Sequence, residues 1–173
     1  MNMQNVHAPS LESREDLSQA MWNFRQILLD NRRLPERLME LVRLRIAFHN
    51  QCRHCMSVRS GAAIADGLTE TLVCSLEKPA EAPDMTEPER AAVAFADKFA
   101  SDHLSIGPEL MARLARHFDG AQIQELGIWC AFCTGFGRMG AVFDRGEELP
   151  VGQKRDDGER LAPWSLVNAP LVN

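Results

Sequence analysis

Apolar residues recur at steps of three and four along nearly the whole chain, and this spacing restricts the fold more than any other feature. Such spacing gathers apolar side chains on one face of an α-helix. The clearest stripe comprises Leu17, Ala20, Met21, Phe24, Ile27 and Leu28. We find no convincing segment with the alternating pattern of a β-strand. The sequence therefore predicts an all-α fold, a compact bundle of several helices.

Capping residues and helix breakers divide this pattern into successive helices. The first expected helix carries the stripe just described. The others are expected at residues 36–48, 52–65, 69–76, 86–100, 107–117 and 119–143. Ser13 with Asp16 is the expected start of the first helix, and Asn50 is the expected N-cap of the third. Thr86 and Asp119 each have a Glu or Gln three residues later, which indicates a capping box. Gly67 suits the end of the third helix.

The chain has 173 residues, enough for one domain with a core of its own. We expect a single helical domain over residues 1–143, with the motif-bearing core at about 34–143. From residue 144 to residue 173 the periodicity gives way to Gly, Pro and charged residues. We expect this irregular C-terminal tail to be loosely ordered or packed against a neighbouring subunit.

Charge and composition exclude several classes of partner. The net charge is −5, aromatic residues are 6% and Tyr is absent, which argues against a nucleic-acid surface. Arg43 and Arg45 lie within an amphipathic pattern and are interpreted as part of a solvated face. No apolar run is long enough to cross a membrane, and Met1–Ser10 lacks a segment of signal-peptide length. These observations favour a cytoplasmic protein whose five cysteines are catalytic, metal-binding or buried rather than a disulfide framework.

Cys52 and Cys55 form a CxxC motif at the expected start of the third helix. In the first turn of a helix, cysteines three apart lie about 5 Å from each other at Cα, within disulfide range. The positive end of the helix dipole favours a thiolate there, and His54 or Arg59 could add cationic charge. The motif thus predicts a redox dithiol, with half of a zinc site or inert core packing as alternatives.

A second CxxC, Cys130 with Cys133, lies inside the long final helix. Far from a helix start, these thiols lack the exposed amides that lower a thiol pKa, so core packing is favoured. A zinc site or an auxiliary redox pair are the alternatives. We expect Cys74, on the short fourth helix, to be buried and inert.

A wider pattern surrounds the first CxxC. Glu40 stands twelve residues before Cys52, the first residue of the sequence Cys52-Arg-His-Cys55. The Ala-rich stretch Ala62–Leu76 follows, and then Glu89–Phe143, which includes Phe-Gly-Arg at 136–138. This pattern resembles the alkylhydroperoxidase D-like proteins of the carboxymuconolactone decarboxylase superfamily. The resemblance implies an alkylhydroperoxidase D-like helical bundle, a homo-oligomer of three or six subunits, and no cofactor or metal.

The resemblance also implies roles for individual residues. Cys55 would attack the peroxide, Cys52 would resolve it as a disulfide, and Glu40 would supply the carboxylate of a proton relay. Arg59 occupies the family's last histidine position and stays protonated, so it can hold a thiolate but cannot carry its proton. On a continuous helix Arg59 would share a face with Cys55 and could pair with Glu40. His54 or His49 would then transfer the proton.

The predicted function is that of a thiol–disulfide oxidoreductase or peroxidase that reduces hydroperoxides and is regenerated by a dithiol-reducing partner protein. One alternative is a cofactor-free decarboxylase in which His54 and Arg59 bind a carboxylate lactone and stabilise enolate charge. Another is a non-catalytic metal-binding or assembly module.

Overall fold

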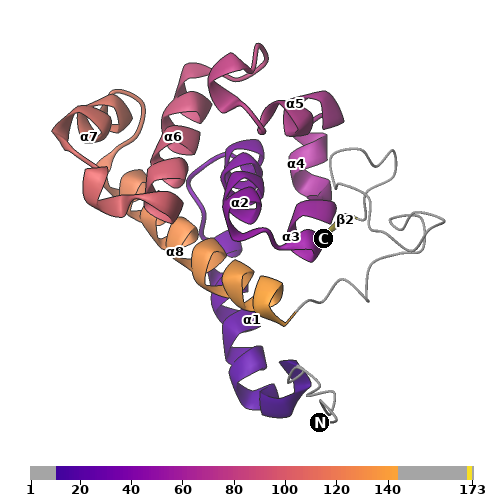
Figure 1. Ribbon diagram of the computed structural model, residues 1–173. Helices are drawn as coiled ribbons and strands as arrows, with labels where there is room; N and C mark the ends of the chain where they lie inside the picture. Colours follow the sequence, from indigo (N-terminus) through magenta and orange to yellow (C-terminus); the bar gives the residue numbers. More distant parts are fainter. Residues whose placement is uncertain (1–10, 144–170, 173) are drawn as a thin grey trace, which may run out of the picture.

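The computed structural model describes residues 11–143 and 171–172, and these residues are almost entirely helical (Figure 1). The α-helices are α1 (Glu15–Asp30), α2 (Glu36–Asn50), α3 (Arg53–Ser57), α4 (Gly61–Ala65), α5 (Glu70–Ser75), α6 (Glu87–Ser101), α7 (Pro108–Ala115) and α8 (Gly120–Val142). Short 3-10 turns are η1 (Leu11–Arg14), η2 (Pro79–Glu81) and η3 (His103–Ser105). Two-residue strands β1 (Arg59–Ser60) and β2 (Leu171–Val172) pair in parallel. The predicted all-α class is confirmed.

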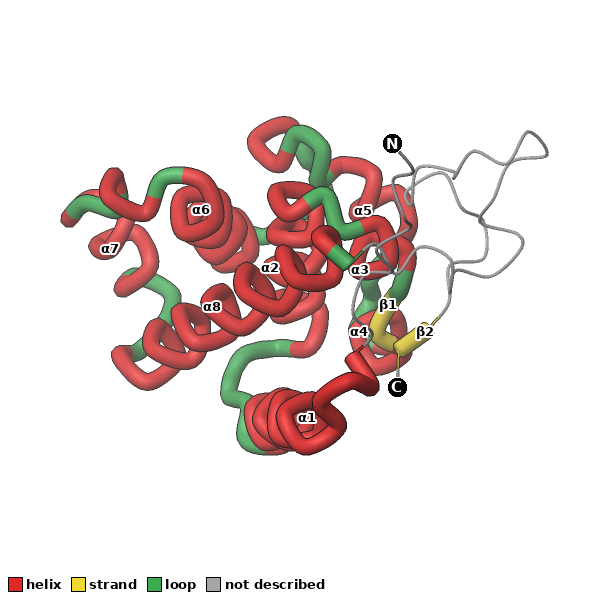
Figure 2. Tube along the Cα trace, turned by 60° about the horizontal axis from the view of Figure 1, so that its bottom comes forward, coloured by secondary structure: helices red, strands yellow, loops and turns green. Residues whose placement is uncertain are grey.

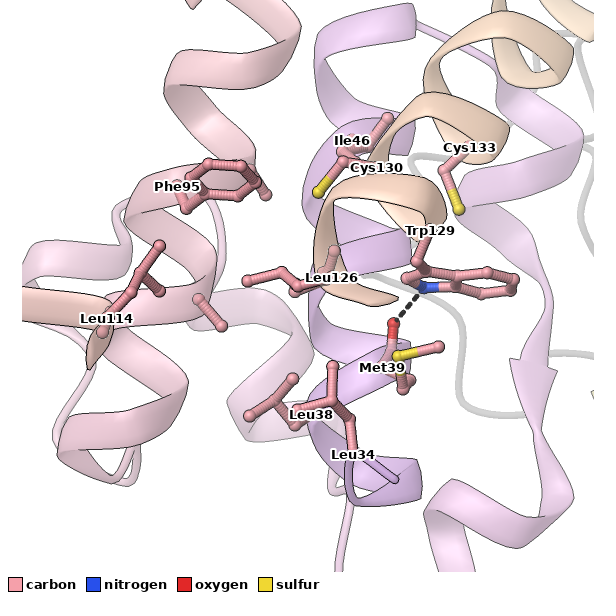
Figure 3. Packing of buried hydrophobic residues seen from close by; sticks show 14 of the residues in the cluster. Leu34, Leu38, Met39, Ile46, Phe95, Leu114, Leu126, Trp129, Cys130 and Cys133 are labelled. Carbon is pink, nitrogen blue, oxygen red and sulfur yellow. Dashed lines mark hydrogen bonds between the residues drawn. The ribbon is translucent and has the colours of Figure 1, made fainter. Parts of the chain in front are cut away.

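Helix α2 lies at the centre of the bundle, between α6 and α8 on one side and α4 and α5 on the other (Figure 1). Its apolar side chains therefore enter two hydrophobic clusters, one shared with α6 and α8 and one shared with α4 and α5. The indole nitrogen of Trp129 on α8 donates a hydrogen bond of 2.9 Å to the carbonyl of Met39 (Figure 3). This bond satisfies a polar group inside the first cluster and fixes α8 against α2.

The expected third helix over 52–65 is wrong, because the chain leaves the helix at Val58. Val58 is extended, with φ −95° and ψ 153°, and the segment divides into α3, β1 and α4. The buried guanidinium of Arg59 donates to the carbonyls of Met56 and Val58 at 2.7 and 2.9 Å. These bonds satisfy carbonyls that a continued helix would have used, and so they stabilise the break.

The N-cap expected at Asn50 is also wrong. Asn50 is the last residue of α2, and Gln51 follows in the left-handed region with φ 51°. Cys52 is the N-cap of α3, and its sulfur accepts a hydrogen bond from the backbone nitrogen of Cys55.

Capping residues predict the later helices well. Thr86 and Asp119 form the expected capping boxes of α6 and α8, and Thr69 caps α5. Gly67 has a φ of 87°, as expected after a helix end. At the other end of the chain, Ser13 and Asp16 do not cap α1, which begins after η1 without a side-chain cap.

Helix α1 stands away from the centre of the bundle (Figures 1 and 2). None of its residues is fully buried, and it meets α8 through contacts such as the Phe24 and Phe132 rings, whose centroids are 5.9 Å apart. Leu17, Phe24 and Ile27 of its apolar stripe are substantially exposed, and so is the neighbouring Trp22.

The predicted irregular tail lies outside the described residues, apart from the backbone of β2, which reaches β1. Within the described ranges, no helix combines the length and the apolar character needed to cross a membrane.

Two glycines on α8 provide a test of the packing between α2 and α8. A Cβ at Gly137 would overlap the amide nitrogen of Asn50, which is buried and donates to the Cys133 carbonyl at 3.0 Å. We expect Gly137→Ala to lower the free energy of unfolding by about 1–3 kcal/mol, because this bond must break or the helices must separate.

Gly135→Ala is the matched control, since a Cβ there meets no atom within 4 Å. It should raise the free energy of unfolding by about 0.5–1 kcal/mol through helix propensity. Urea denaturation measures both changes, and equal effects of the two substitutions would contradict the described contact.

Candidate active site

The candidate site begins where α2 ends and α3 begins. Cys52 and Cys55 are joined by a disulfide, with their Cα atoms 5.2 Å apart. This separation agrees with the spacing expected for the first turn of a helix. The backbone nitrogen of Cys55 lies 3.3 Å from the Cys52 sulfur and donates to it.

The two cysteines differ in their access to solvent. Cys52 is 1% exposed, whereas Cys55 is only partly buried. Both line a cavity of about 160 Å³, together with His54 from the same helix. A small molecule in this cavity would therefore meet Cys55 more readily than Cys52.

Five aromatic residues from α1, α8 and the residue just after α8 line the cavity, namely Trp22, Trp129, Phe132, Phe136 and Phe143. The rings of Trp129 and Phe132 stack with centroids 5.7 Å apart, and Phe132 and Phe136 lie at 4.8 Å. Most of the wall is therefore apolar and preformed, while the sulfurs stand at one end of it.

Helix α8 passes directly over the disulfide at Gly140. A Cβ at this position would lie 3.1 Å from the Cys52 sulfur and 3.7 Å from the Cys55 sulfur. The first distance is tighter than ordinary van der Waals contact, so glycine allows the helix to approach the sulfurs this closely.

A buried ion pair lies beneath the cysteine segment. Arg43 binds Glu40 through two bonds of 2.6 and 2.7 Å, and Glu40 is 4% exposed. Burial alone would raise the pKa of Glu40, but the charge and hydrogen bonds of Arg43 and the Ser60 amide hold it below its usual value. Glu40 is therefore an ionised carboxylate at neutral pH.

The same pair fixes the chain on both sides of α3. Arg43 donates to the carbonyls of Cys55 and Val58 at 2.6 and 2.8 Å, and Glu40 accepts the Ser60 amide at 2.9 Å. The interpretation of Arg43 as part of a solvated face is wrong, since its guanidinium is enclosed by these partners. Glu40 and Arg43 instead set the position of the backbone that carries Cys55.

Arg59 has a different partner from the expected one. Its guanidinium binds Glu70 at 2.8 and 3.1 Å, and the residue is 1% exposed. The expected ion pair with Glu40 is wrong, and so is the expectation of a helical face shared with Cys55, because the helix ends before Arg59. Arg59 lies outside the cavity lining and joins the end of α3 to α5.

The two candidate histidines lie in different surroundings. His54 lines the cavity beside Cys55. His49 instead bonds Asp97 at 2.8 Å, and Asp97 also pairs with Arg45. Of these two residues, only His54 has the position needed to exchange a proton with a group in the cavity.

Cys130 and Cys133 are buried in the core, as expected, with Cys130 beside Ile46 of α2 (Figure 3). Burial raises the pKa of Cys133 to about 12 and the pKa of Cys130 well above its usual value, so both remain protonated thiols. Cys133 also lines the cavity, which its position within a helix did not indicate. The expectation for Cys74 is wrong, because it is exposed.

Across residues 11–143, no group of three or more His, Cys, Asp and Glu side chains is arranged to hold a metal ion. A zinc site built from the two CxxC motifs would need such a group, and the described residues contain none.

Residues 15–98 match the carboxymuconolactone decarboxylase family. The matched segment contains both the Cys52–Cys55 disulfide and the Glu40–Arg43 pair. Over these residues the chain is similar to the carboxymuconolactone decarboxylase family.

Solved structures share this fold. One is an alkylhydroperoxidase AhpD core, an uncharacterized peroxidase-related protein from Ralstonia eutropha JMP134, with a TM-score of 0.70 and 17% identity over 88% of this chain and 78% of that one. Another is a protein of unknown function from Agrobacterium tumefaciens whose name proposes an antioxidant defence role of the AhpD type, with a TM-score of 0.68 and 20% identity over 78% of this chain and 92% of that one. No curated protein matches the sequence.

Sequence reasoning missed two cationic residues of the site, Arg43 and Arg25. Both line the cavity. Arg43 stands three residues after Glu40, which is the spacing of neighbours on a helix, so this pair could have been found. Nothing in the sequence around Arg25 indicates the cavity.

The buried pair predicts a pH-dependent stability effect. Glu40→Gln leaves the Arg43 charge without its counter-ion, and we expect it to lower the free energy of unfolding by about 3 kcal/mol at neutral pH. Because the pKa of Glu40 is lowered in the folded state, the stabilisation is present above the usual value of 4.5 and is lost as the pH falls through the folded value. The gap between wild type and variant should therefore narrow in acid.

Glu87→Gln is the control, since Glu87 is 69% exposed where it pairs with Arg90. It should change the stability by less than about 1 kcal/mol at any pH. Urea titrations at neutral and acidic pH measure both, and a Glu40→Gln loss that does not depend on pH would contradict the assignment.

Proposed function

We propose that this protein is a thiol-dependent peroxidase that reduces organic hydroperoxides with the Cys52–Cys55 couple. The observation that carries the proposal is a disulfide lining an apolar cavity at the start of a helix. The fold shared with the peroxidase-related protein from Ralstonia eutropha supports the same class of reaction.

The different exposure of the two cysteines supports different roles for them. Cys55 is the partly exposed residue of the pair, and as a thiolate it attacks the outer oxygen of the hydroperoxide. The O–O bond breaks, the alcohol leaves, and Cys55 becomes a sulfenic acid. The buried Cys52 thiol then attacks the Cys55 sulfur, which releases water and forms the disulfide. A dithiol reductant restores both thiols by thiol–disulfide exchange and is itself oxidised to a disulfide.

In this proposal the surrounding residues have separate tasks. His54, on the cavity wall, carries the proton that the alkoxide leaving group needs. Glu40 and Arg43 are positioning residues, because the ionised carboxylate is committed to Arg43 and the Ser60 amide. Arg59 is likewise a positioning residue, at the end of α3.

The cofactor-free decarboxylase, which the family match keeps in view, ranks second. A lyase of that kind would not use the disulfide that lines the cavity. Arg59, the residue expected to bind the lactone, also lies outside the cavity lining.

The dithiol-reducing partner protein and the trimer or hexamer stay predictions. The exposed apolar residues of α1, Leu17, Trp22, Phe24 and Ile27, favour burial of this helix against another subunit.

Substitution of the two cysteines separates their proposed roles. Cys55→Ser removes the attacking sulfur, so we expect hydroperoxide consumption to fall at least about 100-fold, to the uncatalysed level. Cys52→Ser keeps the attacking sulfur and should consume about one equivalent of hydroperoxide in a single burst, leaving a sulfenic acid that dimedone traps at Cys55.

Cys74→Ser is the control, since this thiol is exposed and lies outside the cavity lining; it should keep wild-type turnover. Unchanged consumption by Cys55→Ser would overturn the proposal.

A further inference from the structure

Besides Arg43, a second cationic residue, Arg25, lines the cavity. Arg25 reaches it from α1, on the same wall as Trp22, and its guanidinium carbon lies 5.9 Å from the centroid of the Trp22 ring. The cavity thus combines mostly apolar walls with a cationic residue from α1.

Arg25 differs from Arg43 in its partners. Arg43 is committed to Glu40 and to two backbone carbonyls. Arg25 forms neither an ion pair nor a hydrogen bond with any residue in the part of the chain that the structure describes. Its positive charge is the one charge on this wall that the described residues leave without a bonded counter-ion.

The nearest acidic groups do not neutralise Arg25. Glu40 and Glu36 both attract its charge, but Glu40 is bound by Arg43 and Glu36 is bound by Arg32. Burial, followed by repulsion from Arg43, lowers the pKa of Arg25. A partly desolvated guanidinium without a counter-ion gains more from an anionic ligand than an exposed one does.

The size of the cavity limits the ligand. Its volume of about 160 Å³ is close to that of a protein cavity that holds one benzene ring, about 150 Å³. The stacked rings of Trp129 and Phe132 provide an apolar surface for such a body. The ligand that fits these walls has an apolar body of about one ring and an anionic group.

We propose that Arg25 selects carboxylate-bearing hydroperoxides: the carboxylate binds its guanidinium, the apolar body packs on the aromatic wall, and the peroxide reaches Cys55. The reaction itself rests on the proposed peroxidase function, whereas the anion site does not. Arg25 therefore acts as a specificity residue for that chemistry.

Binding of a ligand that does not react tests the anion site alone. We expect 4-isopropylbenzoate to bind the wild-type protein about tenfold or more tightly than its neutral methyl ester, as measured by isothermal titration calorimetry. Arg25→Gln should bring this ratio close to one, and Arg25→Lys should keep most of it. Arg116→Gln, which removes an equal charge from an exposed position after α7, should leave the ratio unchanged.

Turnover of the matching hydroperoxides tests the link to the reaction. The probes are 4-(2-hydroperoxypropan-2-yl)benzoic acid and its methyl ester, and the ratio of their kcat/KM values should follow the binding ratios across the same variants.

Equal binding of acid and ester by the wild type, or a ratio that Arg25→Gln leaves unchanged, would overturn the anion site. If the binding ratio depends on Arg25 but neither hydroperoxide is consumed, the proposed peroxidase function is wrong and the anion site stands. If both are consumed at rates that do not depend on Arg25, the function stands and its proposed selectivity is wrong.

Discussion

The buried ion pair between Glu40 and Arg43 connects the central helix α2 to the segment that carries the disulfide. Arg43 binds the carbonyls of Cys55 and Val58, and Glu40 binds the Ser60 amide, so one pair of side chains fixes α3 at its end and the strand that follows. The charges are stabilised because they meet each other and backbone dipoles in the same enclosed space. This pair therefore supports the position of Cys55 at the cavity from the side of α2.

The cavity has two properties that a hydroperoxide reductase needs. Its mostly apolar wall can accept an apolar body, and its two cysteines differ in exposure, with Cys52 buried and Cys55 partly exposed. Gly140 lets α8 approach both sulfurs closely, so the wall and the reacting pair belong to one compact unit. The cavity also contains Cys133, whose raised pKa keeps it a protonated thiol beside the reactive pair. The proposed reaction therefore uses Cys52 and Cys55 and leaves the second CxxC motif protonated.

The sequence predicts the features of this structure that depend on local contacts. The capping boxes at Thr86 and Asp119 form hydrogen bonds within a single helical turn. The short spacing of Cys52 and Cys55 likewise determines the distance between them, whatever the position of the helix in the bundle. The break at Val58 could not be predicted in this way, because it depends on a guanidinium that is buried only in the folded chain. The Glu40–Arg43 pair has the local spacing of helix neighbours, whereas the pairing of Arg59 with Glu70 depends on where the chain leaves the helix. Arg25 joins the site only because α1 packs beside α8, a tertiary contact with no local signal.

The central claim is that Cys52 and Cys55 form the redox couple and that the other three thiols do not take part. Its most direct test is to add one equivalent of an organic hydroperoxide to the fully reduced protein, unfold it in an alkylating agent, and map the unmodified cysteines by mass spectrometry. The account predicts that two thiols are lost, that both map to Cys52 and Cys55 as one disulfide, and that Cys74, Cys130 and Cys133 are fully alkylated. Oxidation of Cys130 or Cys133, or alkylation of all five cysteines after the hydroperoxide is added, would contradict it.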